Sequence, residues 1–373
     1  MYFTSLTLKR FRNYQSFALT PSKGATVLFG ANGAGKTNIL EAMHLLSLGR
    51  SHRTTVDKEM VMDGETMASV CGITMRQDGK HEVEVRLYPL EKPHKRILLF
   101  HKPAERITDM MGHVTCVMFA PEDIRIVRDG PSARRRFMDM QISQIRPGYI
   151  KALRTFLSVL ESRNALLKGQ RKTPGEGFDA QLETWDEQLA TAAIPVVAER
   201  RWFSEALSQS AAIQYTAISE NREEIFEMRY TGPLANEEQP YEAMLAGLKR
   251  TRAEDIYRKY TAFGPQRDDL SMLLYGKELR AFGSQGQLRT AVLSLKLGEI
   301  ALIEQELGEP PVLLLDDVFS ELDGKRRDAL LRSAEGLQTF ITCTDKQDAA
   351  GAKAQVFLRV WQNTDGGARM EEA

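Results

Sequence analysis

Long apolar runs are absent from this sequence, and so is an excess of charge of one sign. No stretch approaches the roughly 18 apolar residues that a membrane-spanning helix needs, so no such helix is expected. Residues 1–13, with Lys9, Arg10 and Arg12, predict a strand rather than a signal peptide. The 50 Lys and Arg residues are balanced by 50 Asp and Glu residues. Binding to a polyanion would therefore depend on local basic groups.

Cysteine is scarce. Cys71, Cys116 and Cys343 each lie within a short apolar run, and none forms a CxxC pair. This spacing excludes the usual cysteine metal sites. It predicts reduced, buried thiols in a cytoplasmic protein.

Hydrophobic periodicity divides the chain into three parts. Residues 1–122 read as a strand-rich α/β unit, because short apolar runs are separated by turn residues. Residues 123–262 differ, because apolar residues recur there at helical spacing on both sides of a polar break at 168–177. We therefore expect two long helices in an antiparallel hairpin, with Pro195 kinking or dividing the second.

Residues 263–373 return to alternating helix and strand. A helix is predicted at 287–307, and strands at 312–315, 340–343 and 357–360. The expected fold class is α/β, a nucleotide-binding fold whose halves, 1–122 and 263–373, are separated in sequence by a mainly helical arm.

A glycine-rich stretch follows the predicted strand at 25–29. Residues 30–37 read Gly-Ala-Asn-Gly-Ala-Gly-Lys-Thr and match the P-loop pattern, with a strand before and an amphipathic helix after. Backbone N–H groups of such a loop face phosphates, and the helix N-terminus adds positive partial charge. Lys36 is expected to reach the β- and γ-phosphates of ATP, and Thr37 to bind Mg²⁺. The candidate ATP-binding residues are Gly30, Ala31, Asn32, Gly33, Ala34, Gly35, Lys36, Thr37 and Asn38.

A second pattern is an apolar strand that ends in two carboxylates. Residues 312–317 read Val-Leu-Leu-Leu-Asp-Asp. P-loop proteins hold Mg²⁺ opposite the loop with such a carboxylate, which assigns Asp316 to the metal. Asp317 is expected to act as the general base that polarises the attacking water. Taken alone, the pattern is equally that of a strand end followed by a helix cap.

A third pattern, Phe-Gly-Ser-Gln-Gly-Gln at 282–287, stands directly before the predicted helix at 287–307. Ser284 with the amides of Gln285, Gly286 and Gln287 would form a second anion-binding helix N-terminus, although a plain helix cap reads the same. One P-loop needs only one phosphate cradle. A second phosphate-binding site in the same chain therefore predicts that ATP is held between two copies of the chain. Ser284 is then a catalytic candidate together with Lys36 and Asp317.

The P-loop, the Ser-Gln-Gly-Gln sequence, the strand with two aspartates and Ser-Glu-Leu-Asp at 320–323 occur in the order found in ABC/SMC-type ATPase heads. More narrowly, the chain resembles the RecF family of bacterial recombination mediators nearly end to end. The stretches that carry this resemblance are 8–14 (LKRFRNY), 49–54 (GRSHRT), 119–139 (FAPEDIRIVRDGPSARRRFMD), 163–168 (RNALLK) and 264–270 (GPQRDDL).

The resemblance implies a homodimer that closes around two ATP molecules on DNA. Ser284 of one subunit would meet the γ-phosphate held by Lys36 of the other, and slow hydrolysis would reopen the dimer. It also implies a preference for gapped duplexes and single-strand/double-strand junctions. The family works with RecO and RecR to load RecA.

Three positions depart from these patterns. Gln266 stands where the family leads us to expect histidine. Asp317 stands where ABC heads usually carry glutamate, and its shorter side chain suits a slow ATPase. Thr344 occupies the place of the ABC switch histidine and is no useful base near neutral pH.

Contact with DNA would fall to local basic groups, each of which fits a solvated surface equally well. Arg134, Arg135 and Arg136 are expected in a loop entering a helix. The other candidates are Lys168, Arg171 and Lys172 in the polar break, and Lys249, Arg250 and Arg252.

Other functional classes fit the sequence less well. An ATPase subunit of a transporter would need the switch histidine and a transmembrane partner. Another SMC-like chromosome protein would need a far longer heptad arm. A small-molecule kinase would use a P-loop without the sequence at 284–287.

Overall fold

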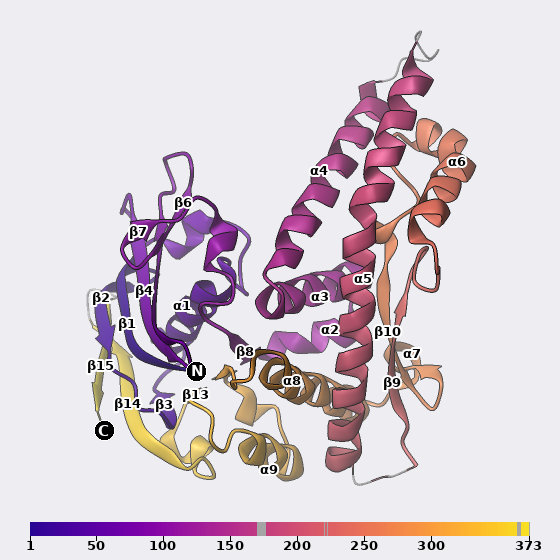
Figure 1. Ribbon diagram of the computed structural model, residues 1–373. Coiled ribbons are helices and arrows are strands. Elements are labelled where there is room, and N and C mark those ends of the chain that lie inside the picture. Colours follow the sequence, from indigo (N-terminus) through magenta and orange to yellow (C-terminus); the bar gives the residue numbers. More distant parts are fainter. Residues whose placement is uncertain (170–176, 220, 222, 364–366, 373) are drawn as a thin grey trace. The chain divides into compact units, whose positions relative to one another are not determined.

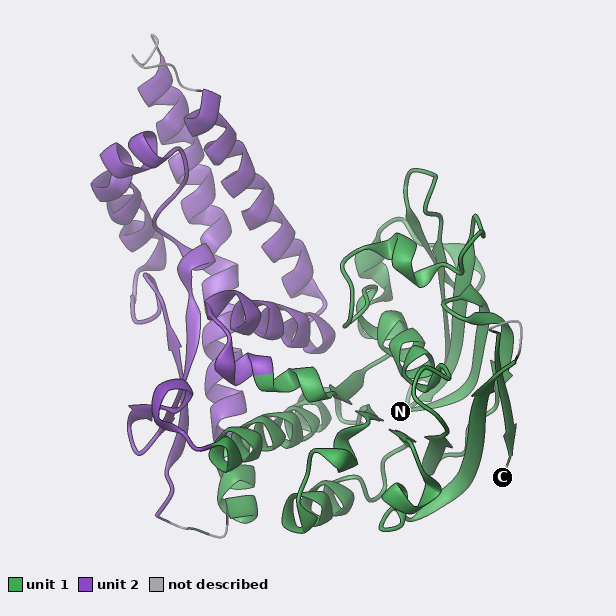
Figure 2. Ribbon diagram, turned by 180° about the vertical axis from the view of Figure 1, so that it is seen from behind, with its two compact units in different colours: residues 1–124, 210–222, 285–373 green, residues 125–209, 223–284 purple. Residues whose placement is uncertain are grey.

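The computed structural model describes residues 1–169, 177–219, 221, 223–363 and 367–372. The chain forms two compact units, coloured separately in Figure 2. Unit 1 comprises residues 1–124, 210–222 and 285–373, and unit 2 comprises residues 125–209 and 223–284. The arm predicted from the sequence begins at nearly the same place but ends at residue 262. Unit 2 extends to residue 284 because strand β10 (Asp269–Leu274) pairs with β9 (Phe226–Thr231).

Unit 1 contains an antiparallel sheet with the strand order β2-β1-β4-β5-β6-β7. Its inward positions carry buried Leu6, Leu8, Val70 and Val85, alternating with less buried residues as a one-sided sheet requires. Its strands are β1 (Tyr2–Phe11), β2 (Tyr14–Leu19), β4 (Ala68–Arg76), β5 (Gly79–Leu87), β6 (Lys95–Leu99) and β7 (Lys102–Pro103).

The second sheet of unit 1 has the order β15-β14-β3-β13-β12-β8, and all its neighbouring strands are parallel except β14 and β15. Its central strands are continuous apolar runs because helices and the other sheet bury both faces. Its strands are β3 (Ala25–Phe29), β8 (Cys116–Phe119), β12 (Val312–Asp316), β13 (Thr339–Cys343), β14 (Ala354–Gln362) and β15 (Ala368–Glu372). The predicted central strands are thus confirmed.

Helix α1 (Lys36–Leu48) contacts strands of both sheets of unit 1 (Figure 1). Eleven of its thirteen residues are buried, which explains why its apolar residues are not confined to one stripe. Gly49 ends it in the left-handed conformation, which glycine adopts at helix C-caps without a steric penalty. The other helical segments of unit 1 are η1 (Asp57–Met60), η2 (Ile107–Met110), η3 (Pro121–Asp123), α8 (Gln285–Leu307), η5 (Val318–Ser320), α9 (Gly324–Ser333) and η6 (Lys346–Ala349).

Unit 2 is mainly helical and carries one small sheet with the order β11-β10-β9. Helices α4 (Gly148–Gly169) and α5 (Phe178–Ser219) lie side by side in Figures 1 and 2, as the predicted hairpin requires. Residues 210–219 at the end of α5 belong to unit 1. Pro195 lies inside α5 and does not divide it. The remaining elements are α2 (Ile124–Arg128), α3 (Pro131–Ile145), α6 (Pro240–Arg258), η4 (Pro265–Arg267), β11 (Lys277–Glu278) and α7 (Leu279–Phe282).

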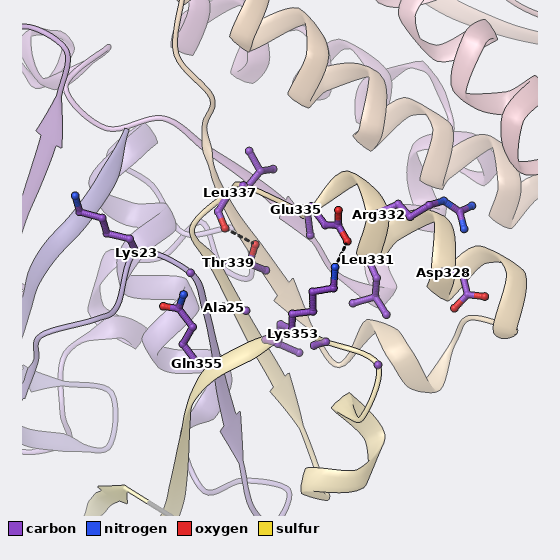
Figure 3. A pocket seen from close by; sticks show the side chains of 16 residues that line it. Lys23, Ala25, Asp328, Leu331, Arg332, Glu335, Leu337, Thr339, Lys353 and Gln355 are labelled. Carbon is purple, nitrogen blue, oxygen red and sulfur yellow. Dashed lines mark hydrogen bonds and ion pairs between the residues drawn. The ribbon is translucent and has the colours of Figure 1, made fainter.

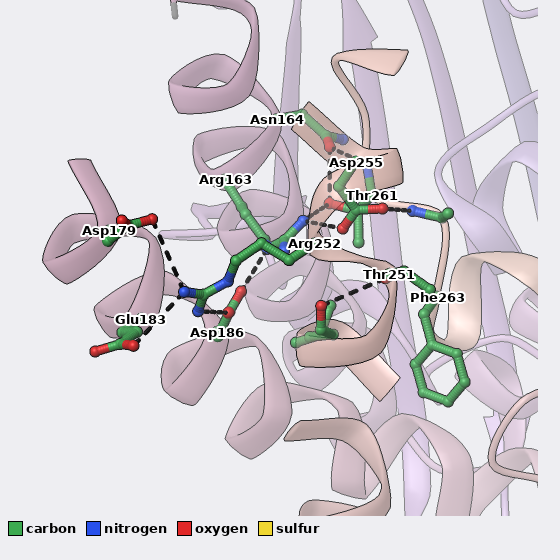
Figure 4. A network of polar contacts seen from close by, with 12 residues as sticks. Arg163, Asn164, Asp179, Glu183, Asp186, Thr251, Arg252, Asp255, Thr261 and Phe263 are labelled. Carbon is green, nitrogen blue, oxygen red and sulfur yellow. Dashed lines mark hydrogen bonds and ion pairs between the residues drawn. The ribbon is translucent and has the colours of Figure 1, made fainter. Parts of the chain in front are cut away.

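A buried guanidinium joins the helices of unit 2 (Figure 4). The fully buried Arg163 of α4 donates from Nε to Asp186 Oδ1 of α5 at 2.7 Å. Its Nη1 donates to Asp255 Oδ2 of α6 at 2.8 Å and to Thr261 Oγ1 at 2.8 Å. A buried charge is tolerated only when it is paired and hydrogen-bonded, so these contacts fix α4 against both partners.

Replacing Arg163 by methionine should therefore destabilise unit 2 by about 3 kcal/mol, because Asp255 would lose the cation that opposes its burial. Asp186 would keep Arg252 at 3.0 Å, which sets the expected loss at the lower end of the range for broken buried pairs. Urea unfolding followed by circular dichroism measures the change. Arg154→Met, at an exposed position of α4, is the matched control. Equal midpoints for both variants would show that the network adds no stability.

Within the described part of the chain, no helix has the length and apolar character of a membrane span. None of the three cysteines, all of which the structure describes, forms a disulfide. Cys116 and Cys343 are buried as predicted, whereas Cys71 is only partly buried.

Candidate nucleotide-binding site

The P-loop connects the carboxyl end of β3 to the first residue of α1. Gly30 has φ 146°, and a Cβ there would lie 2.1 Å from the Val360 carbonyl oxygen of β14. Gly35 has φ 111°, and a Cβ there would lie 2.8 Å from the Asn13 side chain. Both positions combine a positive φ with a close neighbour, so only glycine fits. These two glycines set the path of the loop.

Lys36 folds back over the loop. Its Nζ donates to the carbonyl oxygens of Gly30 at 2.6 Å and Ala31 at 2.9 Å. The side chain is largely buried, and this desolvation lowers the pKa of the ammonium group, while Asp317 and Asp316 act in the opposite direction. The cation is therefore held at the loop by neutral carbonyl groups, which an anionic phosphate would replace as the stronger partner.

Strand register brings three oxygen-bearing side chains together at the carboxyl edge of the parallel sheet. Asp316 ends β12 and lies opposite Thr342 of β13. Asp316 Oδ1 accepts hydrogen bonds from Thr37 Oγ1 at 2.8 Å and from Thr342 Oγ1 at 2.7 Å. Burial raises the pKa of Asp316, and the two hydroxyl donors oppose this shift. Thr37 and Asp316, predicted as a pair, are thus in direct contact.

Asp317 turns away from the strand. Its φ of 50° is left-handed, and its N–H donates to Thr342 Oγ1 at 3.0 Å. The side chain is exposed, and partial desolvation raises the pKa of its carboxyl group despite the nearby Lys36 cation. This geometry directs Asp317 into the cavity beside the P-loop instead of onto Asp316.

That cavity has a volume of about 240 Å³. It is mostly polar, and its position at the ends of β3, β12 and β13 is where open α/β sheets bind ligands. Its lining residues are Asn32, Gly33, Gly35, Lys36, Thr37, Asn38, Arg53, Asp317 and Thr342. Thr344 Oγ1 donates to Oδ1 of Asn32, one of the candidate ATP-binding residues, at 3.4 Å.

Residues far from the motif brace the loop, and their spacing along the chain provides no reason to select them. Asn13 Nδ2 donates to the Ala34 carbonyl at 3.3 Å, and Tyr14 Oη donates to the Gly35 carbonyl at 3.2 Å. Asn38 Nδ2 donates to Asn13 Oδ1 at 2.8 Å, and Arg53 Nη1 donates to Asn38 Oδ1 at 3.0 Å. Asn13, Tyr14 and Arg53 lie in the stretches 8–14 and 49–54 that carry the family resemblance, and Asn38 is one of the candidate ATP-binding residues.

The Ser-Gln-Gly-Gln sequence stands where it is predicted, with Ser284 immediately before α8 and Gln285 as its first residue. Ser284 and Gln285 are exposed. Arg326 of α9 donates from Nη2 to the Gly286 carbonyl at 2.8 Å. Arg289 of α8 pairs with Glu321 of the Ser-Glu-Leu-Asp loop at 2.8 Å. The loop after β12 thus braces the start of α8.

A larger cavity of about 590 Å³ lies elsewhere in unit 1 (Figure 3). It is lined by residues at the amino ends of β3 and β13, including Ala25 and Thr339, whereas the P-loop cavity lies at their carboxyl ends. Lys353 pairs with Glu335 across it at 2.7 Å. None of its lining residues belongs to the predicted motifs.

The basic candidates for DNA contact differ in their environment. Arg134, Arg135 and Arg136 lie in helix α3 and not in a loop, because α3 already begins at Pro131. Arg134 is buried and pairs with Asp269 at 2.6 Å, Arg135 donates to the Asp268 carbonyl, and Arg136 is exposed. Lys168 is exposed, while Arg171 and Lys172 lie outside the described residues. Arg252 pairs with Asp186, whereas Lys249 and Arg250 are exposed.

Gln266, where histidine is expected from the family, is held inside unit 2. Its Nε2 donates to the Phe263 carbonyl at 2.9 Å and more weakly to the Thr261 carbonyl at 3.3 Å. Gln266 Oε1 is buried without a hydrogen-bond partner among the described residues. The residue therefore shapes the turn at 261–266.

Comparison with known proteins places the chain in a family. Residues 2–367 match the family model described as the RecF/RecN/SMC N terminal domain. A protein of Acetivibrio thermocellus named DNA replication and repair protein RecF is 39% identical over 353 residues, which cover 93% of this chain and 94% of that protein. The chain belongs to the RecF family.

Solved structures agree with this assignment. A structure described as the recombination mediator protein RecF-ATP in the RecFOR pathway superimposes with a TM-score of 0.91 at 32% identity, covering 100% of this chain and 97% of the other. The Smc head domain of Pyrococcus furiosus bound to the C-terminal domain of ScpA gives a TM-score of 0.57 at 18% identity, covering 100% and 96% of the two chains, and shows the fold alone. The predicted fold class, an α/β ATPase head of the ABC/SMC type, is confirmed.

Proposed function

We propose that this RecF-family chain is a slow ATPase of DNA repair, recombination and replication that closes as a homodimer around two ATP molecules on DNA. Lys36 would hold the β- and γ-phosphates, with the residues from Gly30 to Asn38 around the nucleotide. Ser284 of one copy, with Gln285 to Gln287, would meet the γ-phosphate bound by the other. Asp317 would polarise the attacking water.

The observation that carries this proposal is the separation of two phosphate-binding features. The cavity at the P-loop is lined by residues around Lys36, Arg53, Asp317 and Thr342, and by no described residue of α8. The start of α8 is nevertheless exposed and braced by Arg326, as a helix N-terminus that binds an anion from another molecule would be. The related RecF structure described as RecF-ATP supports this choice of nucleotide.

Mg²⁺ fits the residues at the carboxyl edge of the sheet. Asp316 and Thr37 supply the hard oxygen ligands that this ion prefers, and the Asp316 carboxylate is buried with only hydroxyl partners on Oδ1. The ion would neutralise charge on the phosphates. The chain's own contribution is to hold Thr37 and Thr342 on the same carboxylate.

DNA is the partner that the names of the relatives support. We place its preferred forms among gapped duplexes and single-strand/double-strand junctions, with RecR and RecO as protein partners and RecA as the protein loaded, in the cytoplasm. Exposed Arg136 and Lys168 remain the candidate phosphate contacts of the first two basic groups. Buried Arg134 would act by holding α3 through Asp269.

Ser284→Arg tests the dimer. The long cation at the start of α8 should block closure while leaving the P-loop of the same chain able to bind ATP. Light scattering coupled to size-exclusion chromatography, with ATP and DNA present, should give a dimer for the parent and a monomer for the variant. Ser158→Arg, on the exposed face of α4, should dimerise normally. A Ser284→Arg chain that dimerises like the parent would exclude the shared site.

A further inference from the structure

We infer that the carboxyl end of α6 and the turn that follows it form a contact surface for single-stranded DNA. This surface, here called the α6 surface, consists of Lys249, Arg250, Tyr257, Arg258, Lys259, Tyr260, Phe263 and Arg267. The inference deepens the proposed function, on which it rests, by assigning a place and a form of DNA.

An exposed aromatic ring is the centre of the α6 surface. Tyr257 is 88% exposed, the largest value among the exposed large hydrophobic residues of the described chain. No cation of the described residues lies over its ring. Burying such a ring against an apolar partner is favourable, so the high exposure of Tyr257 leaves a face of its ring available for stacking.

Two further rings, those of Tyr260 and Phe263, are in contact with arginines. The Arg267 guanidinium lies 5.2 Å from the centre of the Tyr260 ring, and that of Arg250 lies 5.4 Å from the centre of the Phe263 ring. Arg258 Nη1 also donates to Tyr260 Oη at 2.9 Å. Each of these contacts pairs an aromatic ring with a cationic side chain. A nucleic acid would therefore find rings on which its bases can stack and cations for its phosphates.

The cations of the α6 surface are mostly unneutralised. Lys249, Arg250, Lys259 and Arg267 form no ion pair with any residue that the structure describes, whereas Arg258 pairs with Glu254 at 2.9 Å. Arg250, Tyr257 and Arg258 lie seven and eight positions apart on α6 and so share one helix face. The chain as a whole is neutral, and this local excess of positive charge is what a phosphate backbone requires.

One of these cations, Lys259, lies at a strained position of the backbone. Lys259 adopts φ 59° and ψ 31° at the C-cap, a left-handed conformation that usually carries glycine. This conformation is unfavourable for any residue that carries a Cβ. A glycine at position 259 would relieve this strain. The presence of lysine instead suggests that its side chain has a function.

The α6 surface continues toward the end of α4. Ile256 and Leu166 pack against a buried cluster of Leu167, Phe178 and Leu182, so the helical turn before Tyr257 lies near the end of α4 that carries exposed Lys168. Lys168, a candidate from the sequence, therefore extends the same surface. A strand of DNA crossing it would meet phosphate partners on both helices.

Single strands fit this chemistry better than duplexes do. In a duplex the bases are stacked on one another, so a protein contacts their edges in the grooves and the backbone, and the base faces are not available for stacking. In a single strand each base has a free face, and stacking on an aromatic side chain contributes strongly for any sequence. A polyanionic peptide without aromatic residues, such as polyglutamate, would use the cations but has no ring to stack on Tyr257.

Fluorescence anisotropy of the full chain with oligo-dT, a duplex and polyglutamate tests the inference. Tyr257→Ala should weaken binding to oligo-dT about tenfold and leave duplex binding and ATP binding unchanged. Tyr257→Trp should restore oligo-dT binding.

Lys259→Ala should lower the slope of log affinity against log salt for oligo-dT by about 0.7. Tyr275→Ala, an exposed ring at the turn after β10, is the control and should behave like the parent.

The outcomes separate the inference from the proposed function. If the parent binds DNA with ATP but Tyr257→Ala binds oligo-dT equally well, the α6 surface is excluded and the proposed function stands. If Tyr257→Ala weakens binding to polyglutamate as much as to oligo-dT, the surface is a general polyanion site and the inference fails. If the parent binds neither form of DNA, the proposed function fails as well. Unchanged thermal unfolding of the variants shows that each result reports binding.

Discussion

Lys36→Met should reduce ATP affinity by at least about 100-fold. The methionine keeps the aliphatic length of the buried side chain but removes the ammonium group that now contacts the Gly30 and Ala31 carbonyls. A phosphate in the cavity would lose a charge-assisted hydrogen bond in a partly desolvated place, where such bonds are strongest. Isothermal titration calorimetry with a slowly hydrolysed ATP analogue measures the loss.

Lys23→Met is the matched control, because Lys23 is exposed and lines the larger cavity instead of the P-loop cavity. Its affinity for the analogue should equal that of the parent. The unfolding midpoint of Lys36→Met should remain near that of the parent, since the stem of the side chain still packs. A Lys36→Met chain that binds the analogue as tightly as the parent would remove the P-loop from the proposed mechanism.

Asp317→Asn should reduce ATP turnover by about 100-fold or more while preserving ATP binding. The amide has nearly the same shape but cannot accept a proton from the attacking water. Asparagine also tolerates the left-handed backbone at this position, so the turn after β12 should be kept. Because hydrolysis reopens the proposed dimer, the variant should accumulate as a long-lived closed dimer in the presence of ATP and DNA.

Phosphate release under single-turnover conditions measures the rate, and light scattering measures the dimer. Asp328→Asn, at an exposed position of α9, is the control and should turn over normally. Unchanged turnover in Asp317→Asn would exclude Asp317 as the base. A lost rate together with lost ATP binding would instead show that the carboxylate serves the nucleotide pocket, contrary to the assigned role.

Local patterns predict most of the elements of unit 1. A strand, a glycine-rich loop and a helix that follow one another in sequence are neighbours in space by covalent connection, and so the placement of Lys36 and Thr37 follows from spacing. The same holds for Asp316 at the end of an apolar strand. The contact of Thr37 with Asp316 joins residues 279 positions apart, and the motifs predict it only because both ends carry recognisable chemistry.

The sequence predicts the boundaries of unit 2 less well than its helices. Residues 263–284 read as the start of a new α/β part, yet β10 pairs with β9 of the arm. The sequence of a short strand does not indicate its partner strand, because pairing depends on the packing of side chains in the folded sheet. The prediction of a loop for the basic group at 134–136 is likewise wrong, since these residues lie in α3 and Asp269 holds Arg134 inside unit 2.

The sequence by itself determined the class of fold, the phosphate-binding loop and the residues that end the central strands, because these depend on contiguous residues and on the period of apolar side chains. Only the tertiary structure decided which distant side chains form hydrogen bonds to the phosphate-binding loop and to Asp316. Asn13 and Tyr14 reach the loop from the antiparallel sheet, and Thr342 reaches Asp316 from the adjacent strand. Such contacts depend on strand order and register, which place side chains together irrespective of their separation along the chain.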